Sequence, residues 1–314
     1  MSEITNLRVT SVMWKSDSIR VIELRSPDEG PLAPFSAGSH IELHLPTGLV
    51  RSYSLINSQD EKHRYVVAVA RDAASRGGSV FIHDNLRVGD IIHAGVPRNL
   101  FKLNEHSPSA VLIGGGIGIT PLISMAIRLS ELGRNWKLYY AVRTRKEAGF
   151  LRDLAIYGDR VRVHSDDEQG GFLDIRSIVH SAPPNTHFYC CGPRPMMKVF
   201  GELTRNWPPD CIHVEHFTPI DTAAVAGGFL LQLARLGRTV AVPAGSTILE
   251  ALANAGIEVP NSCQRGVCGT CETRVLGGTP DHRDSILTPG ERAAGNTMMI
   301  CCSGSLTEHL VLDI

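Results

Sequence analysis

Short runs of alternating apolar and polar residues fill the first hundred positions of the chain. Over residues 40–45 the sequence HIELHL places polar side chains at every second position and aliphatic side chains between them. This period of two is typical of β-strands that bury one face, and Pro and Gly between the runs indicate turns. The pattern predicts an antiparallel barrel or sandwich built from six runs, residues 7–16, 19–26, 39–46, 49–57, 64–71 and 90–97.

A different pattern begins after about residue 104, where apolar strands alternate with helical stretches. The sequence AVLIGGGIGITPLISMAIRLSEL predicts a buried strand, a glycine-rich turn and an amphipathic helix that begins near Thr120 or Pro121. Further strands are expected at KLYYAVRT, RVRVHSDD and THFYCCGP, with helices between them. This alternation predicts an open parallel sheet.

The last third of the chain has a third organisation, with short strands around one helix. The small residues AAVAGG at 223–228 predict a linker. After it, we expect a hairpin that turns at Leu236 and Gly237, and a helix with Ser246 as its N-cap and Gly256 as its stop, followed by strands at TRVLGG and MMICCSGSL. The chain is therefore predicted to be a multidomain α+β and α/β protein, divided at 1–103, 104–222, a linker at 223–228, and 229–314.

Four of the eight cysteines have a distinctive spacing. CQRGVCGTC, residues 263–271, supplies Cys263, Cys268 and Cys271 in a glycine-rich loop, and Cys301 follows later in the chain. CxxxxCxxC with a distant fourth cysteine is the plant-type pattern that holds a [2Fe-2S] cluster through four thiolates. Disulfides need an oxidising compartment, and structural zinc sites usually pair their cysteines as two CxxC units, so both are weaker alternatives.

Charge and composition narrow the possible partners and location. The 314 residues carry 31 basic and 32 acidic side chains, a formal charge of -1, so nothing indicates nucleic acid or a membrane surface as a partner. We find no signal peptide pattern and no apolar run of the ~18 residues that a membrane span needs. We therefore expect a cytoplasmic monomer, with free thiols at Cys190, Cys191, Cys211 and Cys302.

Two short motifs in the strand-rich region have the composition of a phosphate and ring site. RSYSL, residues 51–55, offers Arg51 as a cation, Tyr53 as an aromatic face and Ser54 as a hydroxyl. SRGGS, residues 75–79, precedes an expected helix VFIHDNL, and its glycines permit close backbone approach to a phosphate. An ordinary strand and an ordinary turn explain each motif alone, but their order within one barrel favours a ligand site.

Together these motifs resemble the flavin site of the ferredoxin-NADP reductase superfamily. The resemblance implies that the arginine and the glycine-serine turn bind the flavin phosphate, with flavin contacts at Arg51, Tyr53, Ser54, Gly77, Gly78 and Ser79. A ferredoxin module placed last resembles the phthalate dioxygenase reductase branch, which uses FMN, whereas relatives with the ferredoxin first use FAD. FMN is therefore the expected flavin.

GGGIGITPL and CGPRPMM extend the resemblance, because they match the two pyridine-nucleotide signatures of the superfamily. There, the first turn lies against the pyrophosphate and the cysteine of CGP approaches the nicotinamide. Cys191, directly before Gly192, is thus the candidate catalytic cysteine, and Arg143 is a candidate for the adenosine half, although a solvated strand-end charge explains it equally well. The implied cofactor-binding residues are Gly115, Gly116, Gly118, Thr120, Pro121, Gly192 and Pro193.

Two further segments of the middle region bear on the reaction. SDDEQGG, residues 165–171, is acidic and disfavours a 2′-phosphate by charge repulsion, so we expect NADH rather than NADPH. HVEHF, residues 213–217, ends the region, and in the superfamily the segment after this strand returns to the flavin. The resemblance makes Glu215 and Phe217 catalytic candidates beside the ring, with a buried aromatic at a strand end as the alternative.

The last region resembles the β-grasp ferredoxin fold, and its ICxS pattern favours Cys301 over Cys302 as the fourth ligand. NADH gives up a two-electron hydride and a [2Fe-2S] cluster accepts one electron, so a flavin that handles both must stand between them. The resemblance covers nearly the whole chain and is to the reductase components of Rieske oxygenase systems. We therefore predict an NADH-dependent oxidoreductase that passes electrons through flavin and cluster to an oxygenase, either an aromatic-ring dioxygenase or an O-demethylase. An NADH-dependent ferric, flavin or cytochrome reductase, or a ferredoxin-like carrier without NADH activity, is the alternative.

Overall fold

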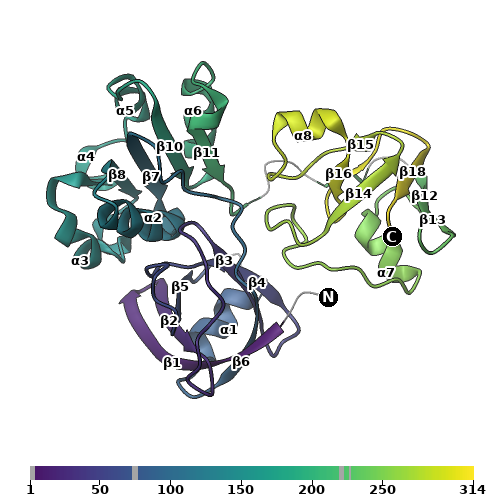
Figure 1. Ribbon diagram of the computed structural model, residues 1–314, viewed down its shortest axis with the longest axis horizontal. Helices are drawn as coiled ribbons and strands as arrows, with labels where there is room; N and C mark the ends of the chain where they lie inside the picture. Colours follow the sequence, from purple (N-terminus) through teal and green to yellow (C-terminus); the bar gives the residue numbers. More distant parts are fainter. Residues whose placement is uncertain (1–3, 73–76, 219–222, 226–227) are drawn as a thin grey trace. The chain divides into compact units, whose positions relative to one another are not determined.

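The structure is a computed structural model that describes residues 4–72, 77–218, 223–225 and 228–314. The chain divides into two compact units, residues 2–215 and residues 216–314 (Figure 1). Positions 226–227 of the expected linker lie outside the described residues. Within the ranges described, no helix combines the length and the apolar character needed to cross a membrane.

The strand-rich region forms an antiparallel sheet of β1 (Ile4–Ser16), β2 (Ile19–Arg25), β3 (His40–His44), β4 (Val50–Ser54), β5 (Tyr65–Ala70) and β6 (Ile91–Gly95). The strand order is β4-β3-β6-β1-β2-β5, and a bridge between Leu55 and Val67 joins the two edges, so the sheet closes into a barrel. One helix, α1 (Gly78–Asp84), follows β5. The aliphatic residues Ile41 and Leu43 are fully buried, as the alternation predicts, but Glu42 between them is only 5% exposed. Both faces of β3 are therefore covered.

The middle region forms the expected parallel sheet, in the order β11-β10-β7-β8-β9. The α-helix α2 begins at Thr120, as predicted, and one face of the sheet packs against it, while α5 and α6 lie on the other face (Figure 1). RVRVHSDD is a strand only to Ser165, since Asp166 begins a short helix. The strands are β7 (Ser109–Gly115), β8 (Asn135–Val142), β9 (Val161–Ser165), β10 (Thr186–Cys191) and β11 (Ile212–Glu215). The α-helices are α2 (Thr120–Glu131), α3 (Leu151–Leu154), α4 (Asp166–Gln169), α5 (Ile175–His180) and α6 (Arg194–Leu203), and the 3-10 turns are η1 (Gly116–Ile119), η2 (Arg145–Glu147), η3 (Ala155–Arg160) and η4 (Pro209–Cys211).

The barrel and the parallel sheet share one hydrophobic core. Val21 and Val66 of the barrel belong to the same buried cluster as Leu112 of β7 and Leu122 of α2. Apolar contact of this extent stabilises the two parts as one body, because separating them would return buried aliphatic surface to water. The 2–215 unit therefore holds the flavin and nucleotide candidates in a fixed relation.

The 216–314 unit has a mixed sheet in the order β13-β12-β18-β14-β16, with a separate β15-β17 pair. The hairpin between β12 and β13 is found where it was predicted, and Gly237 has the positive φ of 60° that its turn needs. The elements are β12 (Phe229–Leu233), β13 (Arg238–Val242), α7 (Ile248–Asn254), β14 (Glu272–Gly277), β15 (Pro280–Asp281), α8 (Pro289–Ala294), β16 (Thr297–Met299), β17 (Gly304–Ser305) and β18 (His309–Leu312).

Two local predictions in this unit are wrong. The N-cap of α7 is Thr247 rather than Ser246, because the Thr247 hydroxyl accepts a hydrogen bond from the backbone N–H of Glu250 in a capping box. Cys301 and Cys302 lie in a turn after β16 and not within a strand, so strand alternation does not decide which of them faces the other cysteines. The tertiary contacts of each thiol decide it.

Candidate functional site

The structure brings the four predicted cluster cysteines together. Cys263, Cys268 and Cys271 come from the loop between α7 and β14, and Cys301 comes from the turn after β16. All four are buried, with exposures of 9%, 2%, 4% and 3%. The Cys301 thiol lies within hydrogen-bond reach of the thiols of Cys263 and Cys271, and the Cys263 thiol within reach of that of Cys268. Two distant segments thus converge on one group of four sulfurs.

Backbone N–H groups surround these sulfurs. Arg265 N donates to Cys263 Sγ at 3.3 Å, and Cys263 N donates to Cys268 Sγ at 3.5 Å. Hydrogen bonds from the Cys268 and Cys301 thiols, with help from backbone N–H groups including that of Arg265, hold the pKa of Cys263 far below its usual range. A thiolate is the form that binds iron, so the donor set fits a four-thiolate cluster.

The cysteine loop requires glycine at position 266. Its φ is 68°, and a Cβ at this position would lie 2.4 Å from Cys302 Sγ. The Cys302 thiol packs here, with the Met299 carbonyl oxygen 3.7 Å away as its hydrogen-bond acceptor, while Cys301 faces the loop cysteines. No three His, Cys, Asp or Glu side chains of the described residues surround a point suited to a single metal ion, but a [2Fe-2S] cluster has the different requirement of two thiolates on each of two irons.

The two nucleotide signatures meet at the carboxyl ends of β7 and β10, which are adjacent parallel strands with Cys191 in register with Gly114. A Cβ on Gly115 would lie 2.6 Å from Pro193 Cδ, and one on Gly118 would lie 2.3 Å from the Cys191 carbonyl oxygen. Only glycine permits this approach of the two turns. The turns therefore form one surface at the edge of the sheet where α/β proteins bind nucleotides.

Cys191 and Glu215 lie side by side at this edge, because β10 and β11 pair them in register. Cys191 is fully buried, and burial, together with the charges of Glu215 and Cys190, raises the pKa of its thiol well above the usual value. Glu215 is half-buried, and its Oε2 has no hydrogen-bond partner among the described residues. Burial raises the pKa of Glu215 to about 8. A neutral thiol thus stands beside a carboxyl group that titrates near neutral pH.

Arg143 and Phe217 are both exposed side chains. Arg143 is exposed after β8, and its carbonyl oxygen accepts a hydrogen bond from Asp167 N at 3.1 Å, so it lies beside the acidic stretch 165–171 at the far strands of the sheet. Phe217 is 37% exposed and belongs to the 216–314 unit.

The two flavin motifs come together in the barrel. A Cβ on Gly78 would lie 2.9 Å from both Cγ and Nε of Arg51, so the arginine stem runs directly over the glycine turn. Gly77 has a φ of 97°, which only glycine adopts readily. Burial raises the pKa of Tyr53 to about 12, partly offset by Arg51, so its phenol stays neutral. The arrangement brings a cation and close-approach backbone to one place, which fits a phosphate group.

The remaining two flavin candidates are the serines Ser54 and Ser79. Ser54 is 4% exposed at the end of β4, and the hydroxyl of Ser79 accepts a hydrogen bond from Asp72 N at 3.2 Å.

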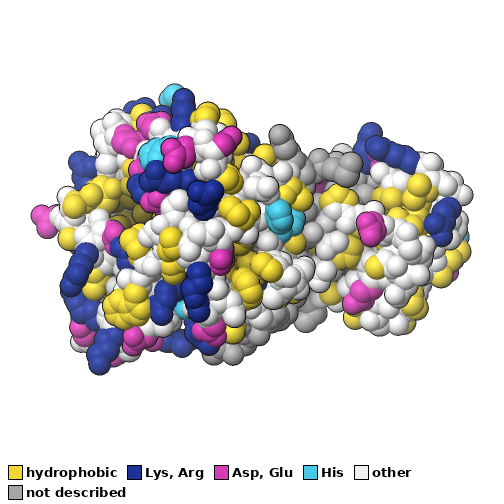
Figure 2. All heavy atoms as spheres, turned by 90° about the horizontal axis from the view of Figure 1, so that it is seen from below, with side chains coloured by type: hydrophobic (Ala, Val, Ile, Leu, Met, Phe, Trp, Pro, Cys, Tyr) yellow, Lys and Arg dark blue, Asp and Glu magenta, His cyan; other side chains and the backbone are white. Residues whose placement is uncertain are grey.

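On the face drawn in Figure 2, basic and acidic side chains are interspersed, in keeping with the net charge of -1.

Comparisons with known proteins identify the family. An oxidoreductase NAD-binding domain matches residues 112–201, and a 2Fe-2S iron-sulfur cluster binding domain matches residues 231–304. The chain is 50% identical over 309 residues to the phenoxybenzoate dioxygenase subunit beta of Ectopseudomonas oleovorans, a match that covers 98% of this chain and 97% of that relative. It is 38% identical over 314 residues to the phthalate dioxygenase reductase of Burkholderia cepacia, covering 98% and 97% of the two chains. The chain belongs to the phthalate dioxygenase reductase family.

The solved structures agree with this family. A phthalate dioxygenase reductase structure matches with a TM-score of 0.75 at 37% identity, covering 99% of this chain and 98% of that one. An intact type IV self-sufficient cytochrome P450 monooxygenase matches with a TM-score of 0.90 at 39% identity, covering 99% of this chain and 41% of the longer one. The predictions of family, fold class, NAD-binding domain and [2Fe-2S] domain are confirmed.

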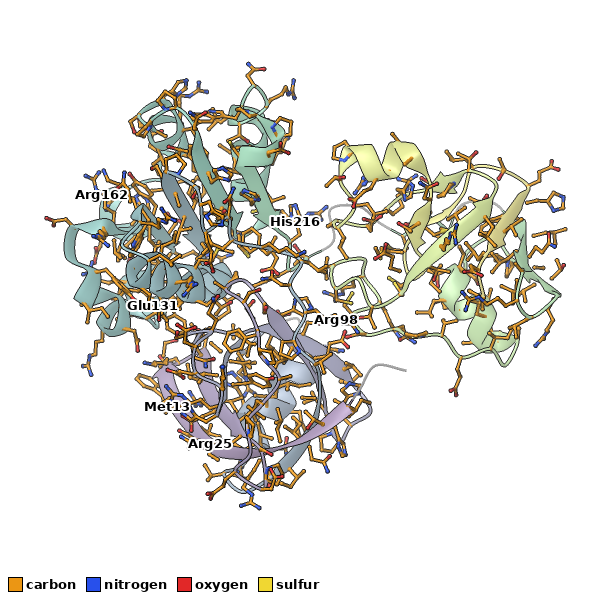
Figure 3. The ribbon with its side chains drawn as sticks, in the orientation of Figure 1. Met13, Arg25, Arg98, Glu131, Arg162 and His216 are labelled. Carbon is orange, nitrogen blue, oxygen red and sulfur yellow. The ribbon has the colours of Figure 1, made fainter. Side chains whose placement is uncertain are left out.

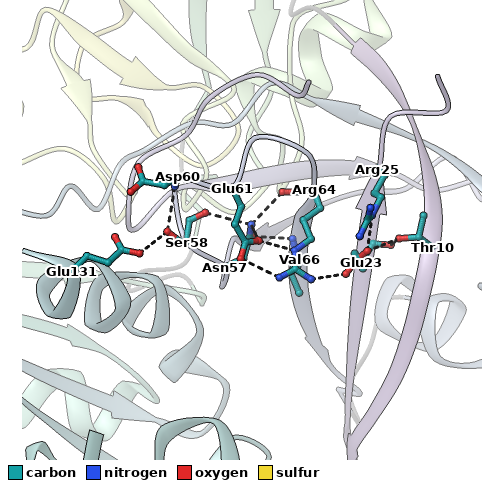
Figure 4. A network of polar contacts seen from close by, with 10 residues as sticks. All are labelled: Thr10, Glu23, Arg25, Asn57, Ser58, Asp60, Glu61, Arg64, Val66 and Glu131. Carbon is teal, nitrogen blue, oxygen red and sulfur yellow. Dashed lines mark hydrogen bonds and ion pairs between the residues drawn. The ribbon is translucent and has the colours of Figure 1, made fainter. Parts of the chain in front are cut away.

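The sequence did not reveal how the barrel of this reductase is fixed to its nucleotide domain. Ser58, in the loop after β4, donates a hydrogen bond from its hydroxyl to Glu131 Oε1 at 2.8 Å (Figure 4). Glu131 is the last residue of α2 and is labelled in Figure 3. Arg128, one turn earlier in α2, makes a two-pronged ion pair with Glu105 at 2.8 and 2.9 Å and lies 3.7 Å from Asp60. Helix α2 is thus anchored to the loop that follows β4. Single charged residues scattered over 70 positions carry no sequence signal for this contact.

Proposed function

We propose that the chain oxidises NADH and passes the electrons, one at a time, through a flavin and a [2Fe-2S] cluster to an oxygenase. The observation that carries this proposal is the presence in one chain of a nucleotide turn pressed against Cys191 and a buried group of four thiols. NADH gives up two electrons as a hydride, whereas the cluster takes one, so a flavin between them converts the electron count. Relatives named for dioxygenase and demethylase systems support an oxygenase as acceptor, while another relative, 44% identical, is named tetrachlorobenzoquinone reductase.

The barrel is our assignment for the flavin, with FMN rather than FAD. The contact between Arg51 and Gly78 supports a terminal phosphate at this turn, since the guanidinium and the backbone approach the same point. The proposed flavin-binding residues are Arg51, Tyr53, Ser54, Gly77, Gly78 and Ser79, of which Gly77 is the N-cap of α1 and Gly78 and Ser79 are its first two residues.

The nucleotide-binding residues proposed for NADH line the paired turns. Glycine at positions 115, 118 and 192 lets the two turns approach each other, Gly116 leaves open space beside the backbone, and α2 directs its N-terminus, at Thr120, toward that edge. The acidic helix α4 beside Arg143 supports NADH over NADPH, because a 2′-phosphate there would face three carboxylates. The full set is Gly115, Gly116, Gly118, Thr120, Pro121, Arg143, Gly192 and Pro193.

Cys263, Cys268, Cys271 and Cys301 are the proposed cluster ligands, and when bound the cluster supplies one-electron transfer. The chain's own contribution is position and environment. The buried Cys191 thiol stays neutral and so places no charge beneath the nucleotide turns, and the shared core of the 2–215 unit holds those turns in a fixed position relative to the barrel. Glu215 holds a proton near neutral pH, and Phe217 remains a proposed catalytic residue.

A cytochrome is the second candidate acceptor, because the chain matches part of a self-sufficient cytochrome P450 at a TM-score of 0.90. We further propose that the protein is a cytoplasmic monomer, with the flavin in 1–103, the nucleotide in 104–222 and the cluster in 229–314, joined by a linker at 223–228. A cluster held by four cysteine thiolates needs reduced cysteines, which fits such a compartment.

Anaerobic titration with NADH tests the proposal. We expect the flavin absorbance to bleach and the EPR signal of a reduced [2Fe-2S] cluster to appear as NADH is added, with FMN released on denaturation. The same titration with NADPH is the control, and we expect it to need far higher concentrations. Cluster absorbance without bound flavin, or no reduction by NADH, would show that the chain is a simple ferredoxin-like carrier.

A further inference from the structure

The segment of residues 281–287, DHRDSIL, connects the two parts of the chain that supply the cysteines. Asp281 pairs with Gly304 in the β15-β17 ladder, and Arg283 N donates to Ser303 Oγ at 3.1 Å, so the segment is attached just after Cys301. On its other side, Ser285 N donates to the Gly266 carbonyl oxygen at 2.8 Å, inside the loop of three cysteines. Nothing in the proposed function so far uses this segment.

Asp284 is the centre of the segment and is fully buried, at 0% exposure. Its Oδ2 accepts hydrogen bonds from the backbone N–H groups of Ile286 at 3.0 Å and Leu287 at 2.8 Å, which fixes a tight turn. Arg292 Nη2 lies 3.9 Å from the same oxygen, and Arg292 also donates to the Asp284 carbonyl oxygen. Burying a carboxylate costs free energy unless a cation or hydrogen-bond donors lie beside it. The two backbone N–H groups and Arg292 supply these partners for Asp284.

The turn that Asp284 fixes presses on the cysteine loop. A Cβ on Gly266 would lie 2.9 Å from Asp284 Cα and 2.4 Å from Cys302 Sγ, so Gly266 is held between these two residues. The second carboxylate oxygen of Asp284 has no hydrogen-bond partner among the described residues, and the nearest ring nitrogen, His282 Nδ1, is 3.8 Å away. Buried oxygens without partners are rare and point to a role beyond stability.

We propose that Asp284 is a positioning residue for the [2Fe-2S] site, whose buried carboxylate holds the three-cysteine loop at a fixed separation from Cys301. The inference rests on the cluster assignment in the proposed function. It has two consequences. If the turn is lost, Gly266 is no longer held in place and the separation between the three-cysteine loop and Cys301 is no longer fixed. If only the negative charge is lost, addition of an electron to the cluster becomes more favourable, which raises the midpoint potential of the cluster.

Two substitutions at Asp284 in the full-length, cofactor-loaded protein separate these effects. Asp284→Asn keeps a side-chain oxygen for the two backbone N–H groups, so we expect near wild-type iron and sulfide content, a higher midpoint potential by EPR-monitored redox titration, and an altered EPR spectrum. Asp284→Ala removes the acceptor, and we expect release of iron to a chelator to be severalfold faster. Asp281→Asn is the matched control, because it removes a carboxylate that pairs with Arg283 on the same segment without contacting Gly266, and we expect no change.

NADH oxidation with ferricyanide as acceptor reports on the 2–215 unit alone, and we expect it to be unchanged in all three variants. Its loss would indicate failure of the proposed NADH and flavin chemistry rather than of this inference. If Asp284→Ala does not accumulate, Ser303→Ala removes the acceptor on the other side of the segment, and we expect it to release iron faster as well. A potential and EPR spectrum for Asp284→Asn identical to those of Asp281→Asn, together with wild-type iron release in the Ala variants, would overturn the inference.

Discussion

Replacement of Glu215 by Gln should stabilise the protein, and only at high pH. Glu215 is paired in register with Cys191, and its Oε2 is enclosed without a hydrogen-bond partner among the residues described. Burial raises the pKa of this carboxyl group from 4.5 to about 8. Glutamine has nearly the same shape and carries no charge, so the substitution removes the titration and little else.

The size of the effect follows from the difference in pKa between the folded and unfolded chains. An acid whose pKa is raised on folding binds its proton more tightly in the folded state, so stability falls as pH rises from about 4.5 to about 8 and is constant above. A difference of about 3.5 pH units corresponds to at most about 5 kcal/mol. Because Glu215 is only half-buried, solvent screens part of this, and we expect about 1–3 kcal/mol.

Urea denaturation of the full-length protein at about pH 9 and about pH 5 measures the difference. We expect Glu215→Gln to have a higher midpoint than the wild type at the higher pH and an equal midpoint at the lower pH. Glu202→Gln, at an exposed position in α6, is the control and should change neither midpoint. Equal stabilisation at both pH values, or none at either, would show that the carboxyl group is not the origin of a pH-dependent cost.

Four other substitutions test three separate parts of the structure. Cys301→Ser should lose or damage the cluster, whereas Cys302→Ser should keep it, as measured by iron content and EPR; the reverse result would contradict the ligand choice. Gly118→Ala places a Cβ 2.3 Å from the Cys191 carbonyl oxygen, so we expect the KM for NADH to rise at least tenfold in a ferricyanide assay, and an unchanged KM would count against the paired turns. Burial alone would raise the pKa of Glu23, but hydrogen bonds from two arginines and a threonine lower it to about 2. Its stabilising contribution is then present above about pH 4.5 and lost as pH falls toward about 2, so Glu23→Gln should be less stable by about 1–3 kcal/mol at pH 7, with a smaller difference at about pH 3 in urea denaturation.

Short sequence patterns predicted most of the helices and strands. They gave a wrong residue where two neighbours have the same functional group. The alternation in β3 and the glycine turn before α2 are properties of a few neighbouring residues, and both were found where they were expected. Ser246 and Thr247 both have the hydroxyl of an N-cap, and only the reciprocal contact with Glu250 distinguishes them. A motif fixes which residue types occur together, but the choice between equivalent neighbours depends on contacts outside the motif.

The sequence by itself determined the three patterns of strands and helices, the four-cysteine spacing and the two nucleotide signatures, because each depends on residues along a short stretch. Only the tertiary structure decided how these pieces meet. It places Cys301 rather than Cys302 toward the loop cysteines, pairs Cys191 with Glu215 across two strands, and buries Asp284 against Gly266. The physical reason is that burial and hydrogen-bond partners are set by residues distant in sequence, and they decide whether a carboxyl group or a thiol is charged, paired or within reach of a cofactor.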